Sequence, residues 1–345
     1  MNPAMKKSTI LFCILHFAFC ISHAQDIHFS QYWESNVLRN PALTGVYTED
    51  FKAGGIYRNQ WGSLGNPFQT MAFSAEGRFA IRHSAADYVT ISAMFFSDKA
   101  GRASLKTTGI YPSINYNKCL SDPHNSYLSV GFTAGYLQRS FDPSKLTVDN
   151  MYQGGAFEPS YGLGETLPLA QMHHWDLGAG VSYNSSIGNA NRIHYILGLS
   201  GYHFTQPKAT FAETKEIVNL ALRMNLSCGL NFAFNDIWAV MLQGNLAFQG
   251  AYKEPMLGGM LQWGRPDENG DKGFGIAAGA QMRFGDAIIP MLKVDFKRQA
   301  LALSYDINTS ALKAATAQRG GLEVTAFFKG FFRRNDDGRR IGPQF

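Results

Sequence analysis

Residues 219–232 alternate between two kinds of side chain at every position, and this segment constrains the fold more than any other part of the chain. Its apolar members are Leu220, Leu222, Met224, Leu226, Cys228, Leu230 and Phe232, and the positions between them include Asn219, Arg223, Asn225 and Asn231. A period of two places these sets on opposite faces of a β-strand, whereas a helix would mix them. A tilted strand that crosses a bilayer needs about 9 to 11 residues with apolar side chains outward and polar ones inward. We therefore expect a transmembrane β-barrel.

The same alternation recurs along most of the chain, interrupted by clusters of Gly, Pro, Asn and Asp that are typical of turns. It predicts strands at residues 51–60, 68–79, 88–97, 105–117, 127–139, 175–184, 193–204, 217–234, 237–249, 255–263, 274–284, 287–296, 299–308 and 321–331. These amount to about 14 strands, an even number as bacterial barrels require. Because an open sheet would leave edge N–H and C=O groups unpaired in lipid, the last strand must pair with the first. The predicted fold is all-β, a transmembrane antiparallel β-barrel; a large soluble β-sandwich is the alternative.

Composition agrees with a barrel better than with a soluble enzyme. The chain of 345 residues is 45% hydrophobic and 17% charged, and its 35 glycines and 13% aromatic residues suit tight turns and interfacial rings. The mean hydropathy of -0.16 resembles that of a soluble protein, but alternation hides the lipid-facing half of each strand. A net charge of only +5 predicts no nucleic-acid partner.

The N-terminus has the organisation of a secretory signal peptide. Lys6 and Lys7 form a basic start, residues 10–21 an apolar core, and Ser22-His23-Ala24 a small-residue cleavage site. We expect a signal peptide at residues 1–24, an N-terminal periplasmic or plug segment at 25–50, the barrel at 51–332 and a periplasmic tail at 333–345. A signal peptide followed by a barrel predicts the cell outer membrane of a diderm bacterium.

Residues 25–47 lack a sustained period but are too aromatic for a free linker. Burial of one aromatic side chain is worth roughly 1.5 to 3 kcal/mol, so leaving several in water would be costly. We therefore expect residues 26–45 to fold against or into the periplasmic mouth and to plug the lumen; a disordered leader remnant is the alternative. The residues expected to pack in this way are Phe29, Tyr32, Trp33, Asn40 and Pro41.

Three charges are predicted to meet inside the barrel. If both ends of the barrel are periplasmic, the first strand rises and carries inward-facing Arg58 close to the outer rim. The next-to-last strand also rises, with Asp306 inward, and the last strand descends with Glu323 inward near the same level. Closure makes the last strand the neighbour of the other two, so we expect an ionic network across the seam. In the alternative, each charge is separately solvated in a wet lumen.

The alternation stops between residues 141 and 171. Long connections in barrels lie on the extracellular side, and exposed aromatic side chains in a loop are typical binding anchors. We expect this loop to contact exported cargo through Tyr152, Phe157 and Tyr161. A lid that folds over the barrel is the alternative.

No catalytic or metal site is predicted. His173, His174 and Asp176 form the most enzyme-like cluster, but no nucleophile-elbow serine accompanies them, because GLSGY at residues 198–202 has the wrong spacing. Cys119 and Cys228 remain after cleavage, and we expect free thiols because Cys228 belongs to the lipid-facing row of its strand. No Cys or His spacing suits a metal ion, and we expect no cofactor.

Short motifs near both ends of the mature chain resemble the PorP/SprF family of type IX secretion systems. Near the start these are Gln25-Asp26, Phe29-Ser30-Gln31-Tyr32, Asn40-Pro41-Ala42, Gly45 and Tyr57-Arg58-Asn59-Gln60-Trp61. Near the end they are Leu303-Ser304-Tyr305-Asp306, Ser310, Leu312 and Gly320-Gly321 before Glu323. Between them only the strand pattern supports the resemblance, and Gly320-Gly321-Leu322 departs from the single glycine that is common in the family.

The resemblance implies a non-enzymatic outer-membrane barrel that serves the secretion or surface attachment of adhesin-like cargo, with gliding motility in some members. Its implied partners are the secreted cargo protein and periplasmic type IX secretion components, and a barrel also contacts outer-membrane lipids. A passive porin or hydrophobic-solute channel is the competing class, in which an Asn-Pro-Ala in the lumen would also be familiar. Loss of a surface adhesin from a deletion strain would separate the two classes.

Overall fold

The computed structural model describes residues 26–332, except residues 63–66, 82–85, 102–103, 147–150, 154–155, 159–169, 189–190, 209–210, 212–218, 267–271 and 312. The expected signal peptide, residues 1–24, and the expected tail, residues 333–345, lie outside the described residues. Within the described part of the chain, no helix is long and apolar enough to cross a membrane.

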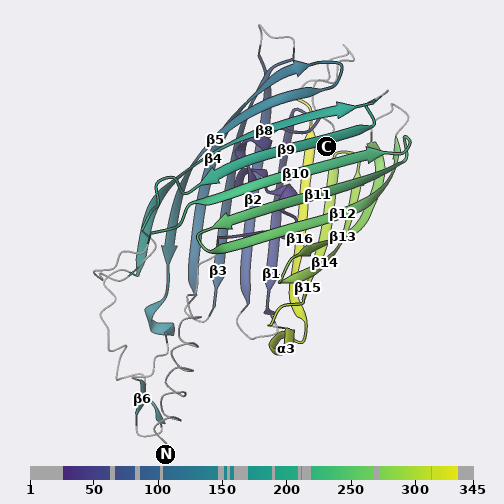
Figure 1. Ribbon diagram of the computed structural model, residues 1–345. Coiled ribbons are helices and arrows are strands. Elements are labelled where there is room, and N and C mark those ends of the chain that lie inside the picture. The colour runs from purple at the N-terminus through teal and green to yellow at the C-terminus, as the bar shows by residue number, and fades with distance from the viewer. Residues whose placement is uncertain are drawn as a thin grey trace, which may run out of the picture.

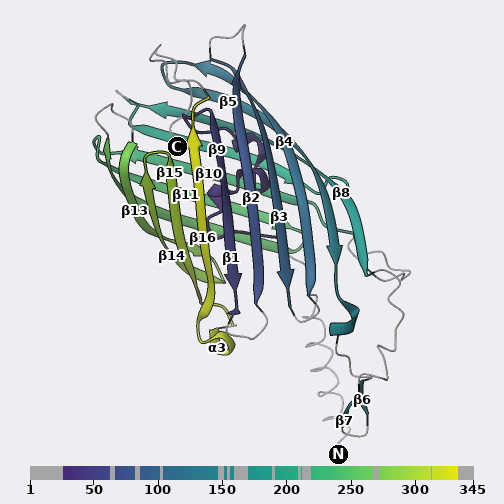
Figure 2. The ribbon, with the colours of Figure 1, turned by 180° about the vertical axis from the view of Figure 1, so that it is seen from behind.

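Fourteen strands close into one antiparallel barrel, which confirms the predicted fold class. Figures 1 and 2 show the barrel from opposite sides. Strands that follow one another in the wall are hydrogen-bonded, and β16 closes the barrel by pairing with β1. The strands are β1 (Phe51–Gln60), β2 (Phe68–Ala80), β3 (Tyr88–Ala100), β4 (Leu105–Ser121), β5 (Ser126–Ser140), β8 (Gln171–Ile187), β9 (Ile193–Tyr202), β10 (Arg223–Ala233), β11 (Trp238–Gln249), β12 (Tyr252–Pro266), β13 (Lys272–Arg283), β14 (Ala287–Phe296), β15 (Gln299–Asn308) and β16 (Arg319–Gly330). A separate two-stranded sheet of β6 (Tyr152–Gln153) and β7 (Ala156–Phe157) lies in the β5–β8 connection.

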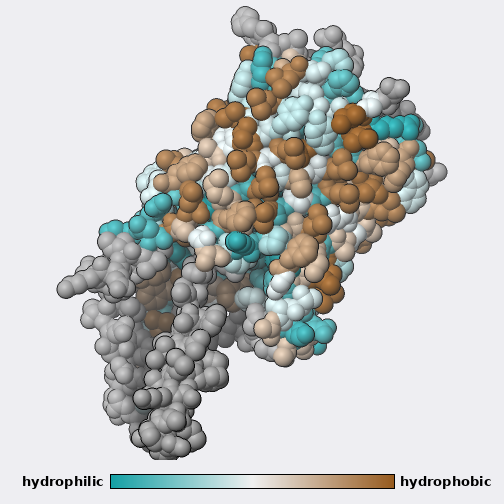
Figure 3. Space-filling view, in the orientation of Figure 1, coloured by the Kyte–Doolittle hydropathy of each residue, from teal (hydrophilic) through white to brown (hydrophobic). Residues whose placement is uncertain are grey.

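The two faces of the strands meet different surroundings, as the alternation predicts. On β10, Leu226 and Cys228 are exposed on the outside, whereas Asn225 and Ser227 are buried in the interior. Figure 3 shows apolar side chains over much of the outer wall. Because lipid offers no hydrogen bonds to the backbone, a closed ladder of strands with an apolar outer face suits a bilayer.

The strand around residues 219–232 is shorter than predicted, because β10 begins only at Arg223. Arg223 pairs with Tyr202, the last residue of β9, and with Gln249, the last residue of β11. Residues 219–222 therefore have no strand on either side among the described residues, apart from an isolated bridge between Asn219 and Lys208. The alternation of residues 219–222 continues that of the strand, but the backbone there belongs to the β9–β10 connection.

The two rims of the barrel differ in their connections. One rim carries the long connections at residues 141–170 and 203–222, together with the short helix α3 (Lys313–Thr316). The other rim carries shorter turns and both ends of the strand series, Phe51 and Gly330, which pair with each other. Outer-membrane barrels have longer extracellular loops and short periplasmic turns. We therefore call the first rim extracellular and the second periplasmic; α3 and β6 mark the extracellular rim at the lower end of Figure 1.

Residues 26–50 lie inside the barrel, as the purple ribbon in Figure 2 shows. This segment forms 3-10 turns at Tyr32–Glu34 and Pro41–Leu43, on either side of the short helix α2 (Asn36–Arg39). Phe29 and Val37 belong to a buried cluster with side chains of the wall, namely Ile56, Ala72, Met94, Phe96, Tyr111 and Leu137. Part of the hydrophobic core therefore lies between the N-terminal segment and the inner wall.

Candidate functional site

The N-terminal segment, residues 26–50, contacts the wall along most of the lumen. At its start, the Asp26 carboxylate pairs with His203 and lies 3.5 Å from Arg223 Nη1, where β9 ends and β10 begins at the extracellular rim. Near its end, Gly45 N donates to Glu76 Oε2 at 2.8 Å, close to the periplasmic end of β2. The segment thus reaches much farther than the periplasmic mouth that the sequence predicted. Polar groups along the whole interior provide its hydrogen-bond partners, and buried polar groups require such partners.

Arg58, Asp306 and Glu323 lie together at the seam where the barrel closes. β16 pairs with both β1 and β15, and Arg58 is the direct register partner of Glu323. Arg58 Nη2 is 2.8 Å from Asp306 Oδ2, and Arg58 Nη1 is 3.1 Å from Glu323 Oε2. None of the three side chains is more than 2% exposed. The three charges are therefore paired with one another rather than separately solvated.

Ser30 and Gln31 connect the N-terminal segment to this seam network, which the sequence did not predict. The backbone N–H groups of Ser30 and Gln31 donate to the two carboxylate oxygens of Glu323, each at 2.7 Å. Ser30 Oγ donates to Asp306 Oδ1 at 2.6 Å. A buried ionic group is tolerated only when its remaining lone pairs are also satisfied. The segment supplies donors for this purpose at the point where the last strand meets the first.

Arg283 is a second buried arginine in the seam network. Its Nη1 is 3.1 Å from Asp306 Oδ2 and 2.8 Å from Asp286 Oδ2, and its Nη2 donates to Ser30 Oγ at 2.9 Å. Arg283 ends β13, so the parity that predicted an inward Arg58 would also have placed Arg283 in the lumen. The sequence argument missed it because that argument considered only the strands at the seam.

Asn40 and Pro41 lie against a glycine-lined part of the wall. Asn40 Nδ2 donates to backbone carbonyl oxygens of β8 and β9 at 3.2 and 3.3 Å. A Cβ added at Gly180 would lie 2.0 Å from Asn40 Oδ1, and a Cβ added at Gly131 would lie 2.4 Å from the carbonyl carbon of Pro41. Glycine at these two wall positions therefore permits the close approach of the segment.

The three aromatic residues predicted to pack, Phe29, Tyr32 and Trp33, all lie in the lumen. Phe29 is 2% exposed and Tyr32 is 5% exposed. The rings of Tyr32 and Trp33 meet edge to face with centroids 5.2 Å apart, and the guanidinium of Arg39 lies 4.9 Å from the Tyr32 centroid. Trp33 also packs against a methionine-rich cluster of the opposite wall that contains Met241, Met260 and Met291. These contacts hold the first half of the segment between two sides of the barrel.

Glu34 forms a second ionic contact between the segment and the wall. Its carboxylate lies 2.8 Å from Lys52 Nζ and 3.3 Å from Lys293 Nζ. Both ammonium groups also face the ring of Phe327, at 4.6 and 4.9 Å from its centroid. One carboxylate of the segment thus bridges β1 and β14, on either side of the two strands β15 and β16.

His173 and Asp176 of β8 do not come together in a site. His173 faces outward, where its Nδ1 is 3.1 Å from the hydroxyl of Tyr136, whereas Asp176 is buried in the interior. Asp176 accepts a hydrogen bond from the Tyr111 hydroxyl at 2.8 Å and lies 3.0 Å from His203 Nδ1. Residues 173 and 176 therefore serve different faces of the strand, as the period of two requires.

His203 instead forms a third anchor for the N-terminal segment, because it lies between Asp176 of the wall and Asp26 of the segment. Burial lowers the pKa of His203, but the two carboxylates outweigh burial and raise this pKa from 6.5 to about 9. His203 is therefore an imidazolium at neutral pH, and it links two carboxylates that would otherwise repel each other.

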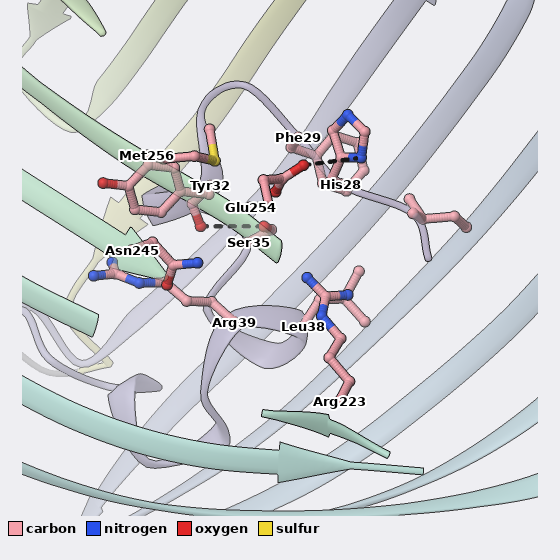
Figure 4. Close-up of a pocket in the computed structure, with 11 residues that line it drawn as sticks. His28, Phe29, Tyr32, Ser35, Leu38, Arg39, Arg223, Asn245, Glu254 and Met256 are labelled. Carbon is pink, nitrogen blue, oxygen red and sulfur yellow. Dashed lines mark hydrogen bonds and ion pairs between the residues drawn. The ribbon is translucent and has the colours of Figure 1, made fainter. Parts of the chain in front are cut away.

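A cavity of about 20 Å³ remains between the segment and the wall, beside His28, Arg39 and Glu254 (Figure 4). His28 Nδ1 is 3.6 Å from Glu254 Oε2 across it. Such a volume has room for about one water molecule and not for a larger solute.

The predicted cargo loop is described only in part. Tyr152 is 62% exposed on β6, where it pairs in register with Phe157 of β7. Tyr161 lies outside the described residues.

Cys119 and Cys228 are both free.

Solved structures similar to this chain are β-barrels of low sequence identity. A Pseudomonas aeruginosa FadL homologue has 10% identity and a TM-score of 0.47, and the match covers 86% of this chain and 94% of that one. The CymD monoaromatic hydrocarbon channel has 11% identity and a TM-score of 0.47, with 87% and 94% covered. BamA from Haemophilus ducreyi has 10% identity and a TM-score of 0.36, with 81% and 70% covered. No curated protein sequence matches the chain.

A family profile, in contrast, matches nearly the whole chain. The family is described as type IX secretion system membrane protein PorP/SprF, and the match runs over residues 21–328. This range includes the N-terminal segment, all but the last residues of the barrel, and every residue of the seam network. It is a family of secretion barrels and not a known class of enzymes. The chain belongs to the PorP/SprF family, and it is a type IX secretion-related β-barrel of the outer membrane.

Proposed function

We propose that this barrel retains adhesin-like cargo at the cell surface during type IX secretion, with its lumen closed by the N-terminal segment. The observation that carries this proposal is the way the segment is bound. Ion pairs tie it to the wall at Asp26 and at Glu34, and the backbone N–H of Ser30 donates a buried hydrogen bond to Glu323. A solute that passed through the barrel would have to displace all of these contacts. A barrel whose lumen is closed would bind its partners at its two rims.

The extracellular rim supplies the surface for cargo in this proposal. The connection at residues 141–170 leaves this rim, and Tyr152 in it is 62% exposed. Exposed aromatic side chains bury much area at little entropic cost, which makes them effective anchors for a protein partner. Periplasmic secretion components would contact the opposite rim. Gliding motility, which the family resemblance implies for some members, would be a further output of cargo display.

A deletion strain tests the role in cargo display. Complementation with the full chain should restore surface cargo, whereas a chain that lacks residues 145–165 should give a heat-modifiable barrel without surface cargo. A chain that lacks residues 206–218, in the other long extracellular connection, is the matched control and should retain cargo. Normal surface cargo in the strain that lacks residues 145–165 would contradict the proposed contact.

Conductance in planar bilayers separates this proposal from a passive porin or hydrophobic-solute channel. The purified full chain should conduct little, and deletion of residues 26–45 should raise its conductance. High conductance that the deletion leaves unchanged would instead identify an open channel.

A further inference from the structure

Lys99 and Lys106 form a like-charged pair on the outer wall at the extracellular rim. They are direct register partners on β3 and β4, one residue pair before the ladder ends at the connecting turn. Both side chains are exposed. They continue the outward alternation of Phe95 and Ile110, which are 51% and 47% exposed. Both lysine side chains therefore project from the same patch of the lipid-facing surface.

The protein does not balance these two charges within its described part. No hydrogen bond or ion pair reaches either ammonium group from the described residues, and the residues beside them in register, Gln69 and Ser140, are uncharged. Side chains directly opposite each other on neighbouring strands have Cβ atoms about 4.5 to 5.5 Å apart, so the two lysines repel. A third lysine near this turn, Lys145, has its own partner 3.2 Å away in Asp142. An anion bound between Lys99 and Lys106 would remove their repulsion.

The height of the pair matches that of lipid headgroups. Four residues farther from the rim, an outward row crosses the wall through Phe95, Ile110, Tyr136 and Trp175. Trp175 is 65% exposed, and its ring lies 5.1 Å from that of Tyr136. Rows with Tyr and Trp mark the boundary between hydrocarbon and headgroups. Lys99 and Lys106 lie four residues nearer the extracellular rim than Phe95 and Ile110 on the same two strands, which at a tilt of about 45° amounts to about 9 Å in height and places the lysines on the headgroup side of these apolar side chains.

We infer that the Lys99–Lys106 pair binds the phosphorylated headgroup of a lipid in the outer leaflet, which in an outer membrane is lipid A. Each ammonium is a compact point charge that suits one phosphate oxygen, so the two lysines hold one phosphate between them. The acyl chains then lie over the apolar row below, which includes Phe95 and Ile110. This site is outside the lumen and does not depend on the proposed role in cargo display.

Native mass spectrometry of the purified barrel, released from phosphatidylcholine nanodiscs doped with bisphosphorylated lipid A, tests the site. Each lysine near an anionic surface contributes about fivefold in affinity, so Lys99→Gln with Lys106→Gln should weaken lipid A binding by roughly thirtyfold. Lys99→Arg with Lys106→Arg should retain binding. Lys253→Gln is the matched control, because Lys253 opposes Phe248 in register rather than a second lysine. Heat-modifiable migration of each variant establishes that the barrel is folded.

Three outcomes would overturn the inference. Equal retention of lipid A by the double glutamine variant and the wild type would show that the lysines do not hold it. Equal binding of dephosphorylated lipid A would show that acyl chains alone are recognised. Displacement by inorganic phosphate at matched concentration would identify a free-anion site in place of a lipid site.

Discussion

Replacement of Arg58 by alanine tests whether the seam network stabilises the folded barrel. Arg58 lies 2.8 Å from Asp306 and 3.1 Å from Glu323, and its side chain is 2% exposed. Without it, Asp306 keeps Arg283 at 3.1 Å. Glu323 keeps two backbone N–H donors at 2.7 Å but loses its only cation in the network. The variant therefore contains one buried carboxylate without a neutralising charge.

Removal of one partner from a buried ion pair typically costs about 3 to 5 kcal/mol. Because the N–H donors remain, we expect the free energy of unfolding to fall by about 3 kcal/mol, near the lower end of that range. A wet lumen would reduce the loss to below about 1 kcal/mol. Glu323→Gln in the same chain removes the unpaired charge and should restore part of the stability. Restoration should be incomplete, because the amide offers one acceptor oxygen where the carboxylate offered two.

Urea unfolding of the barrel in lipid vesicles measures these differences. Arg298→Ala is the matched control, because Arg298 is exposed in the β14–β15 turn. That control should change the free energy of unfolding by no more than about 0.5 kcal/mol. An Arg58→Ala variant as stable as the wild type, or a double variant no more stable than Arg58→Ala, would refute the assigned role of the network.

Two further predictions concern the N-terminal segment. The pKa of His203 is raised from 6.5 to about 9, so its ion pairs with Asp26 and Asp176 stabilise the fold fully below pH 6.5 and are lost as the pH rises through about 9. Arg223 also faces Asp26 and is present in both proteins, so the free energy of unfolding of the wild type should fall over this interval relative to that of His203→Gln; parallel pH profiles would argue against the anchor. Gly180→Ala should increase protease cleavage within residues 26–50, because the new Cβ would lie 2.0 Å from Asn40 Oδ1, whereas Gly264→Ala, with its nearest neighbour at 3.6 Å, should not. Equal protection in both variants would count against a close fit at Asn40.

Alternation along the chain by itself determined the barrel, the number of strands and the face that each strand residue occupies. A period of two specifies the two faces of a strand without knowledge of its partners, and lipid requires that the apolar face point outward. The same parity, combined with closure, was sufficient to bring Arg58 to Glu323, which are direct register partners. The alternation wrongly placed residues 219–222 in the strand, because a strand ends where its neighbouring strands end.

Only the tertiary structure decided the path of the N-terminal segment and the residues that receive it. Residues 26–50 have no period, so their sequence shows that they are too apolar for water but not which wall they face. Ser30 contacts Asp306 across 276 positions of sequence, and Asp26 contacts His203 across 177. Such pairs depend on the order and stagger of strands around a closed barrel, which the local pattern of side chains does not encode.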